Sequence, residues 1–255
     1  MLQAHSILWH YLWLAPHVLE LGLALLLWRR GTWRGFPVFF AYLVFVGIEE
    51  ITLYALDVAP AVTWQSWWGA FWAGTVVEAL LKFGVIAELL HHLLQPWPAL
   101  AHVGRNFVRL AGVLLVLVAA VAAAFTAPNN PHWLISGSHT LRQTVYITDA
   151  GLILSIFLLA TYFHIPWERG RFGIALGFGV SWCEHLAVAA VAATGALTVR
   201  PELLDLLNMA TYHVVVLIWF YYLVVRHRVT TKSAVVLPEN NLAVWNRELE
   251  RLFQQ

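Results

Sequence analysis

Seven long apolar stretches run through the 255-residue chain, separated by short segments rich in Gly, Pro and Arg. The stretches occupy residues 7–28, 36–57, 68–94, 110–126, 141–163, 172–194 and 203–225. A helix needs about 20 residues to cross a bilayer, and each stretch is close to that length or longer. The pattern predicts an all-α, polytopic integral membrane protein. We expect seven transmembrane helices within residues 1–228 and a tail over 229–255.

The composition supports a bilayer as the solvent of this chain. Hydrophobic residues make up 60% of it and charged residues 11%, whereas soluble proteins carry about 25% charged residues. The net charge is +1 and no basic stripe lies outside the short loops, which argues against a nucleic-acid partner. The single cysteine, Cys183, allows no internal disulfide. No Lys or Arg precedes the first apolar stretch, so we expect a mature span there and not a signal peptide.

Basic residues gather on one side of the predicted membrane. They are Arg29, Arg30, Arg34, Arg105, Arg109, Arg169, Arg171, Arg226, Arg228 and Lys232, whereas the other side holds Arg142 and Arg200. Cytoplasmic loops are enriched in Lys and Arg, so we expect the N-terminus outside and the C-terminus inside, in a plasma (inner) membrane of bacterial type. Tryptophans should anchor both interfaces. The outer set is Trp64, Trp67, Trp68 and Trp72, and the inner set is Trp28, Trp33, Trp97 and Trp167.

Two pairs of segments suggest an internal repeat. HVLELGLALLLW in the first stretch matches YITDAGLILSIF in the fifth, with an acid followed two positions later by Gly-Leu. WRGFPVFFAYLVFVGIEE leading through the second stretch matches ERGRFGIALGFGVSWCEH leading through the sixth, and both end in adjacent ionisable residues. A duplication would make a 3+1+3 arrangement of parallel repeats, as in some transporters. Chance similarity is the alternative explanation.

In outline this arrangement is similar to sugar-transporting SWEET proteins and to opsins, but no sequence motif of either is present. An opsin-like Schiff base would need a lysine in the last stretch, and the only lysine within any stretch is Lys82. TYHVVVLIWFYY resembles the last span of cytochrome oxidase subunit three. GIEEITLY resembles the paired-glutamate motif of membrane lycopene cyclases, without the proline expected before it. These short resemblances leave the family unassigned.

Ionisable residues interrupt the apolar stretches near half-depth, as judged from the rise of about 1.5 Å per helical residue. The predicted site consists of Glu49, Glu50, Glu78, Lys82, Asp149, Glu184, His185 and His213, with His17 and Glu20 slightly lower. Glu78 and Lys82 are spaced i, i+4, which suits an ion pair. The polar residues recur at helical spacing, and such stripes should face the interior of the bundle.

The energetics of these residues require partners. A lone charge at the bilayer centre costs about 2.5 kcal/mol or more. Lys82 can neutralise one carboxylate, and the histidines cannot balance all of the others. Like charges packed side by side in low dielectric cannot all be ionised. The surplus acids must therefore be protonated, solvated in a water-filled cavity or bound to a cation.

These outcomes favour a site that binds a small solute, a proton or a cation for transport or sensing. Two alternatives stay open. The chain could be an accessory or structural subunit of a membrane complex, or an intramembrane enzyme, metal- or acid/base-dependent, that acts on a lipid or isoprenoid. The sequence assigns no catalytic residue and no cofactor. It has no HExxH motif, so zinc, iron or manganese would need ligands from several spans, and a haem between His185 and His213 is a further alternative.

The tail carries one predicted element. LAVWNRELERLF, within residues 240–253, places apolar side chains on one face of an amphipathic helix. Such a helix can lie on the inner leaflet of the bilayer or bind a membrane or cytoplasmic protein partner. The tail is too short for a signalling domain, so a sensor of this kind would signal through a separate protein.

Overall fold

The structure is a computed structural model that describes residues 6–59, 62–95, 102, 104, 106, 109, 112–113, 133–162, 165, 167–193, 201–225 and 251. Its long helices are α1 (Ile7–Arg29), α2 (Pro37–Val58), α3 (Trp64–Leu94), α5 (Trp133–Tyr162), α6 (Arg169–Ala193) and α7 (Pro201–Val224), and the 3-10 turn η1 (Thr32–Gly35) precedes α2. Six of the predicted stretches are therefore helical. Most of the fourth, 110–126, and the tail helix at 240–253, apart from Arg251, lie outside the described residues.

Four of these helices are long and apolar enough to cross a bilayer, which indicates a membrane protein. They are Ile7–Arg29, Pro37–Val58, Val145–Tyr162 within α5, and Leu203–Val224 within α7. Their outward faces are apolar, since Leu25, Ile48, Leu158 and Leu217 are 46–61% exposed. α3 and α6 are more polar, because α3 carries Glu78, Lys82 and Glu88, and α6 combines ionisable residues with several glycines.

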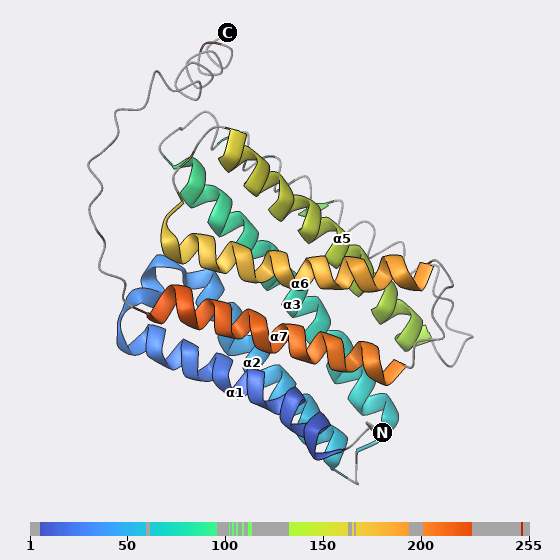
Figure 1. Cartoon of the computed structure of the whole chain (residues 1–255). Helices are drawn as coiled ribbons and strands as arrows, with labels where there is room; N and C mark the ends of the chain where they lie inside the picture. The colour runs from blue at the N-terminus through green and yellow to red at the C-terminus, as the bar shows by residue number, and fades with distance from the viewer. Residues whose placement is uncertain are drawn as a thin grey trace.

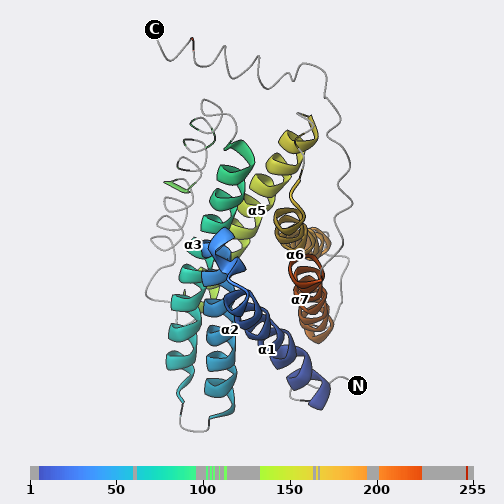
Figure 2. The same cartoon turned by 90° about the vertical axis from the view of Figure 1, so that its left-hand side faces the viewer.

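The six described helices form a closed ring in the order α1, α2, α3, α5, α6, α7, each in contact with its two neighbours. Figures 1 and 2 show the two groups α1–α3 and α5–α7 side by side. By the colour gradient of Figure 1, successive helices within each group are antiparallel. Where the groups meet, α3 and α5 run in the same direction, as do α7 and α1.

Two arginines and the partly buried Glu88 cap the helices at one end of the ring. The Arg30 side chain donates to Val224 O at 2.9 Å, and Arg169 donates to Tyr221 O at 3.1 Å, so both satisfy carbonyls at the end of α7. Glu88 of α3 accepts the backbone N–H groups of Val38 and Phe39, at 3.1 Å each. Free backbone groups are costly in an apolar medium, so these contacts fix how α2, α3 and α7 pack. We call this end, marked by Arg30 and Arg169, the arginine end.

An aromatic cluster fills the ring toward the arginine end. Phe39 and Tyr42 of α2 pack against Phe178 and Trp182 of α6 and Trp219 of α7, and none of the five is more than 2% exposed. Ring centroids lie 5.2 Å apart for Phe39–Trp219, Tyr42–Phe178 and Phe178–Trp182. The edge-to-face and stacked arrangements are those that aromatic pairs prefer. We call these five residues the aromatic plug, because they close one half of the ring.

Small residues let neighbouring helices approach closely. A Cβ added at Gly173 of α6 would overlap Tyr222, and one added at Gly177 would overlap the indole of Trp219. Gly47 of α2 makes the same kind of approach to α1, where Leu21 Cδ2 would lie 2.7 Å from an added Cβ. Glycine at such positions is typical of helix packing in membranes, where van der Waals contact drives association.

Gly177→Ala should lower the free energy of unfolding in detergent by about 1–3 kcal/mol, because the added methyl group forces Trp219 out of the aromatic plug. Gly151→Ala is the matched control, since nothing lies within 4 Å of a Cβ added there. It should be neutral or stabilise α5 by about 0.5–1 kcal/mol. Equal effects of the two changes would contradict the close α6–α7 contact.

Candidate functional site

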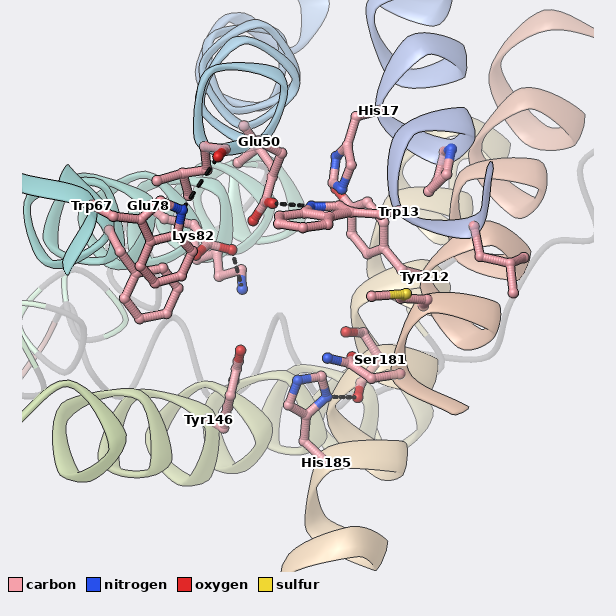
Figure 3. Close-up of a pocket in the computed structure, with 17 residues that line it drawn as sticks. Trp13, His17, Glu50, Trp67, Glu78, Lys82, Tyr146, Ser181, His185 and Tyr212 are labelled. Atoms are coloured by element: carbon pink, nitrogen blue, oxygen red, sulfur yellow. Dashed lines mark hydrogen bonds and ion pairs between the residues drawn. The ribbon is translucent and has the colours of Figure 1, made fainter. Parts of the chain in front are cut away.

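A cavity of about 220 Å³ lies inside the ring and is lined by side chains from all six helices. Figure 3 shows its polar wall. The lining residues with polar groups are Trp13, His17, Glu50, Trp67, Glu78, Lys82, Tyr146, Ser181, His185, Asn208 and Tyr212. They come from the first halves of α1, α5 and α7, from the first half and the middle of α3, and from the middle and later parts of α2 and α6. The cavity therefore lies mainly beyond the aromatic plug, away from the arginine end.

Lys82 and Glu78 form the ion pair that their spacing predicts. Lys82 Nζ lies 2.7 Å from Glu78 Oε1, and the lysine side chain is only 8% exposed. The ammonium also lies 5.1 Å from the centre of the Tyr146 ring, which is a cation–π contact. The ion pair neutralises two charges at the cavity wall, and the contact of Lys82 with Tyr146 joins α3 to α5.

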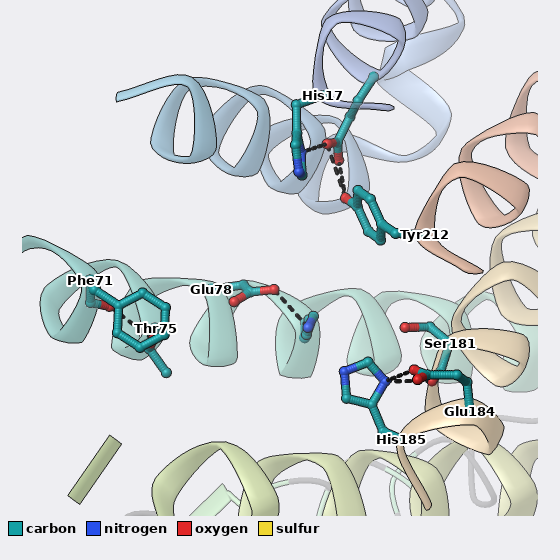
Figure 4. A network of polar contacts seen from close by, with 10 residues as sticks. His17, Phe71, Thr75, Glu78, Ser181, Glu184, His185 and Tyr212 are labelled. Carbon is teal, nitrogen blue, oxygen red and sulfur yellow. Dashed lines mark hydrogen bonds and ion pairs between the residues drawn. The ribbon is translucent and has the colours of Figure 1, made fainter. Parts of the chain in front are cut away.

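Glu20 of α1 joins α1 to α7 on the other side of the ring, where Figure 4 shows His17 and Tyr212 close together. Its carboxylate is fully buried and accepts the Tyr212 hydroxyl, 3.0 Å from each oxygen. His17 Nδ1 lies 3.3 Å from Glu20 Oε2, and the His17 ring packs against Tyr212 with centroids 5.0 Å apart. The three side chains tie α1 to α7, with His17 and Tyr212 facing the cavity and Glu20 behind them.

Glu50 is the cavity carboxylate for which the described part of the chain provides no ion pair. It accepts the Trp13 indole N–H, with 2.9 Å from Nε1 to Oε2. Among the described residues, no ion pair joins Glu50 to a Lys, Arg or His. His17 interacts with Glu50 electrostatically, but no hydrogen bond or ion pair between the two is found. The other Glu50 carboxylate oxygen is therefore available to a group bound in the cavity.

His185 provides the α6 wall of the cavity. Its Nδ1 lies 2.7 Å from Ser181 O and 2.7 Å from Glu184 Oε2. The contact of Nδ1 with Ser181 O has the geometry of a hydrogen bond. The contact with Glu184 Oε2 meets the distance of an ion pair, but among the described residues no group donates a hydrogen bond to that oxygen. His185 also packs on Tyr146 of α5, with ring centroids 4.0 Å apart. These contacts fix the imidazole in place between α5 and α6.

Asp149 is fully buried, and neither of its oxygens accepts a hydrogen bond from the described residues. It does not line the cavity, but it is near enough to Lys82 and Glu78 to interact with both electrostatically. An unsatisfied buried carboxylate is costly unless a proton or a nearby positive charge compensates it. Asp149 therefore adds negative potential, or a site for a proton, directly behind the Glu78–Lys82 pair.

The structure brings most of the predicted site together. His17, Glu50, Glu78, Lys82 and His185 line the cavity, and Glu20, Glu184 and Asp149 lie behind them. Glu49 and His213 do not line it. Glu49 packs against Gly74 of α3, and the His213 ring lies 6.3 Å from that of Tyr11.

Tryptophans at the site were missed by the sequence reasoning. Trp67, expected at the outer interface, lines the cavity and donates its indole N–H to Leu53 O at 3.2 Å. Trp13 holds Glu50, although no interpretation of the sequence singled it out. Its spacing of four residues from His17 and seven from Glu20 places it on their helical face, and this signal could have identified it.

Among the described residues, no group of three His, Cys, Asp or Glu side chains is arranged to hold a metal ion. No protein-family model, curated protein or solved structure matches this chain. The functional argument therefore rests on the cavity and its chemistry.

Lys82→Met should destabilise the protein by about 3–5 kcal/mol, because it leaves Glu78 and Asp149 in the interior without their positive charge. The double variant Glu78→Gln/Lys82→Met should recover most of that loss, since it removes both charges of the pair. Unfolding in detergent measures both. Arg171→Met is the control, because it breaks the more exposed Arg171–Glu168 pair of 3.0 Å and should cost less than about 1 kcal/mol. A double variant no more stable than Lys82→Met would contradict a buried pair.

Proposed function

We propose that this membrane protein binds a small solute in the cavity of the helix ring and carries it across the bilayer. The observation that carries the proposal is the convergence of all six described helices on one cavity with ionisable walls. Ionisable groups within membrane helices usually mark substrate or ion pathways. A mainly packed structural subunit would have no need of a cavity lined by Glu50, Lys82 and His185 together.

A seventh span over 110–126 completes the proposed topology. Because α3 and α5 run in the same direction, the residues between them must connect opposite ends of the ring. An odd number of further crossings satisfies this requirement, and 110–126 is apolar enough for one. With Arg30 and Arg169 at one end of the ring, the positive-inside bias favours a cytoplasmic arginine end in a plasma membrane. The cavity would then lie closer to the outer surface of the membrane than the aromatic plug does.

We further propose that the ring arose by duplication of a three-helix unit, an origin that would favour transport. The matched sequence segments pair His17 with Tyr146 and Glu20 with Asp149. The first two residues both line the cavity, and the last two are both fully buried behind it. The second matched segment pairs Glu50 with His185, which face the same cavity.

The contacts between the two units correspond in the same way. Where α1 meets α7, Tyr212 contacts Glu20 and the ring of His17. Where α5 meets α3, Lys82 interacts with Asp149 and lies over the ring of Tyr146. Transporters built from parallel repeats bind substrate at the interface between the repeats, which is the position of this cavity.

Ser181→Cys, made together with Cys183→Ser, tests the cavity in the membrane. Ser181 lines the cavity, so a thiol there should react with a water-soluble methanethiosulfonate reagent added from outside. In a transporter the same thiol should also react from the cytoplasmic side in inside-out vesicles, because the aromatic plug opens during the cycle. Mass spectrometry of the labelled protein measures the extent of reaction.

Leu158→Cys in the same background is the control. Leu158 is 61% exposed on the outward face of α5, so its thiol faces lipid and should stay unreacted. Reaction of Ser181→Cys from one side only would indicate a sensor. Absence of reaction from both sides in folded protein would contradict a solute-accessible cavity.

A further inference from the structure

We infer that the solute is a small organic cation, held by the carboxylate of Glu50 against the aromatic walls of the cavity. This inference rests on the proposed function and adds the chemical class of the ligand. It draws on the charges that face the cavity, on the aromatic rings that surround them and on the volume that they enclose.

The first step is the charge balance of the cavity wall. Lys82 is already paired with Glu78 at 2.7 Å, and His17 lies 3.3 Å from Glu20. Among the described residues, Glu50 has one hydrogen-bond donor, the neutral indole of Trp13. Asp149 lies buried behind the Glu78–Lys82 pair, where it adds negative potential when it is ionised. Glu50 is therefore the cavity carboxylate for which the described residues provide no ion pair, and a cationic ligand that supplies one gains the attraction of opposite charges.

The second step is the character of the walls around Glu50. Trp13, Trp67, Phe71, Tyr146 and Tyr212 all contribute to the lining. Trp67 and Phe71 stack with centroids 5.3 Å apart, and Trp13 lies beside the Glu50 carboxylate in Figure 3. Aromatic faces attract organic cations, most strongly where water is excluded. A bare metal ion would gain little from such walls, whereas an alkylammonium group suits both the rings and the carboxylate.

The third step is size. The cavity measures about 220 Å³, and a protein cavity of about 150 Å³ accepts benzene. A ligand of roughly six to ten non-hydrogen atoms would therefore fill this one. Tetramethylammonium, with five, is slightly smaller than this range and so fits the cavity.

Isothermal titration of the full-length protein in lipid nanodiscs tests the inference with three probes of similar size and different charge. Tetramethylammonium should bind, whereas neutral tert-butanol and anionic pivalate should not. Glu50→Gln should weaken tetramethylammonium binding by roughly tenfold or more, because the counter-charge is lost. Glu168→Gln, which changes an exposed carboxylate outside the cavity, should leave it unchanged.

Asn208→Asp keeps the test decisive if Glu50→Gln fails to fold. Asn208 lines the same cavity, so a second carboxylate there should tighten tetramethylammonium binding. Binding of pivalate in preference to tetramethylammonium, or a Glu50→Gln variant with unchanged affinity, would overturn the cation assignment and leave the solute cavity intact. If none of the probes binds, the cation assignment is also wrong, and the accessibility of the Ser181→Cys thiol then decides separately whether the cavity takes any solute.

Discussion

A bilayer offers no partner to an ionisable side chain, and this constraint organises the whole ring of helices. Glu20 contacts Tyr212 and His17, and the Tyr212 contact holds α1 against α7. Glu78 pairs with Lys82, whose ammonium lies over the Tyr146 ring on α5. The two polar contacts close the ring at the two places where parallel helices meet. Apolar packing alone would not determine which helices are neighbours, because an apolar side chain is about as stable against lipid as against another helix.

The same constraint explains the division of the ring into two halves. Toward the arginine end, aromatic side chains and close glycine contacts fill the interior, and Glu88 and the two arginines satisfy the backbone. Toward the other end, the acids and histidines prevent dry packing and leave a cavity. A packed half beside an open half is the arrangement expected of a site that is reached from one side at a time.

Much of the fold could be predicted from the apolar pattern, since the six described helices coincide with predicted stretches, although α5 begins eight residues before the predicted 141–163. Burial of Lys82, Asp149, Glu20 and His17 followed from the cost of exposing charge to lipid. The cavity wall was harder to predict. Glu49 and Glu50 are adjacent, and sequence alone cannot say which of two neighbours on a helix faces the centre. Trp67 lies in a tryptophan-rich segment of the kind that anchors helices at a membrane interface. Its inward position became clear only from its hydrogen bond to Leu53 of α2.

Water-edited solid-state NMR of the protein in lipid vesicles tests most directly whether these polar groups share an interior cavity. Magnetisation that starts on mobile water should reach the side chains of Glu50, Lys82 and His185, and should not reach Trp219 in the aromatic plug. Transfer to Glu50, Lys82 and His185 from lipid acyl chains instead of water would contradict the account, because those groups would then face outward.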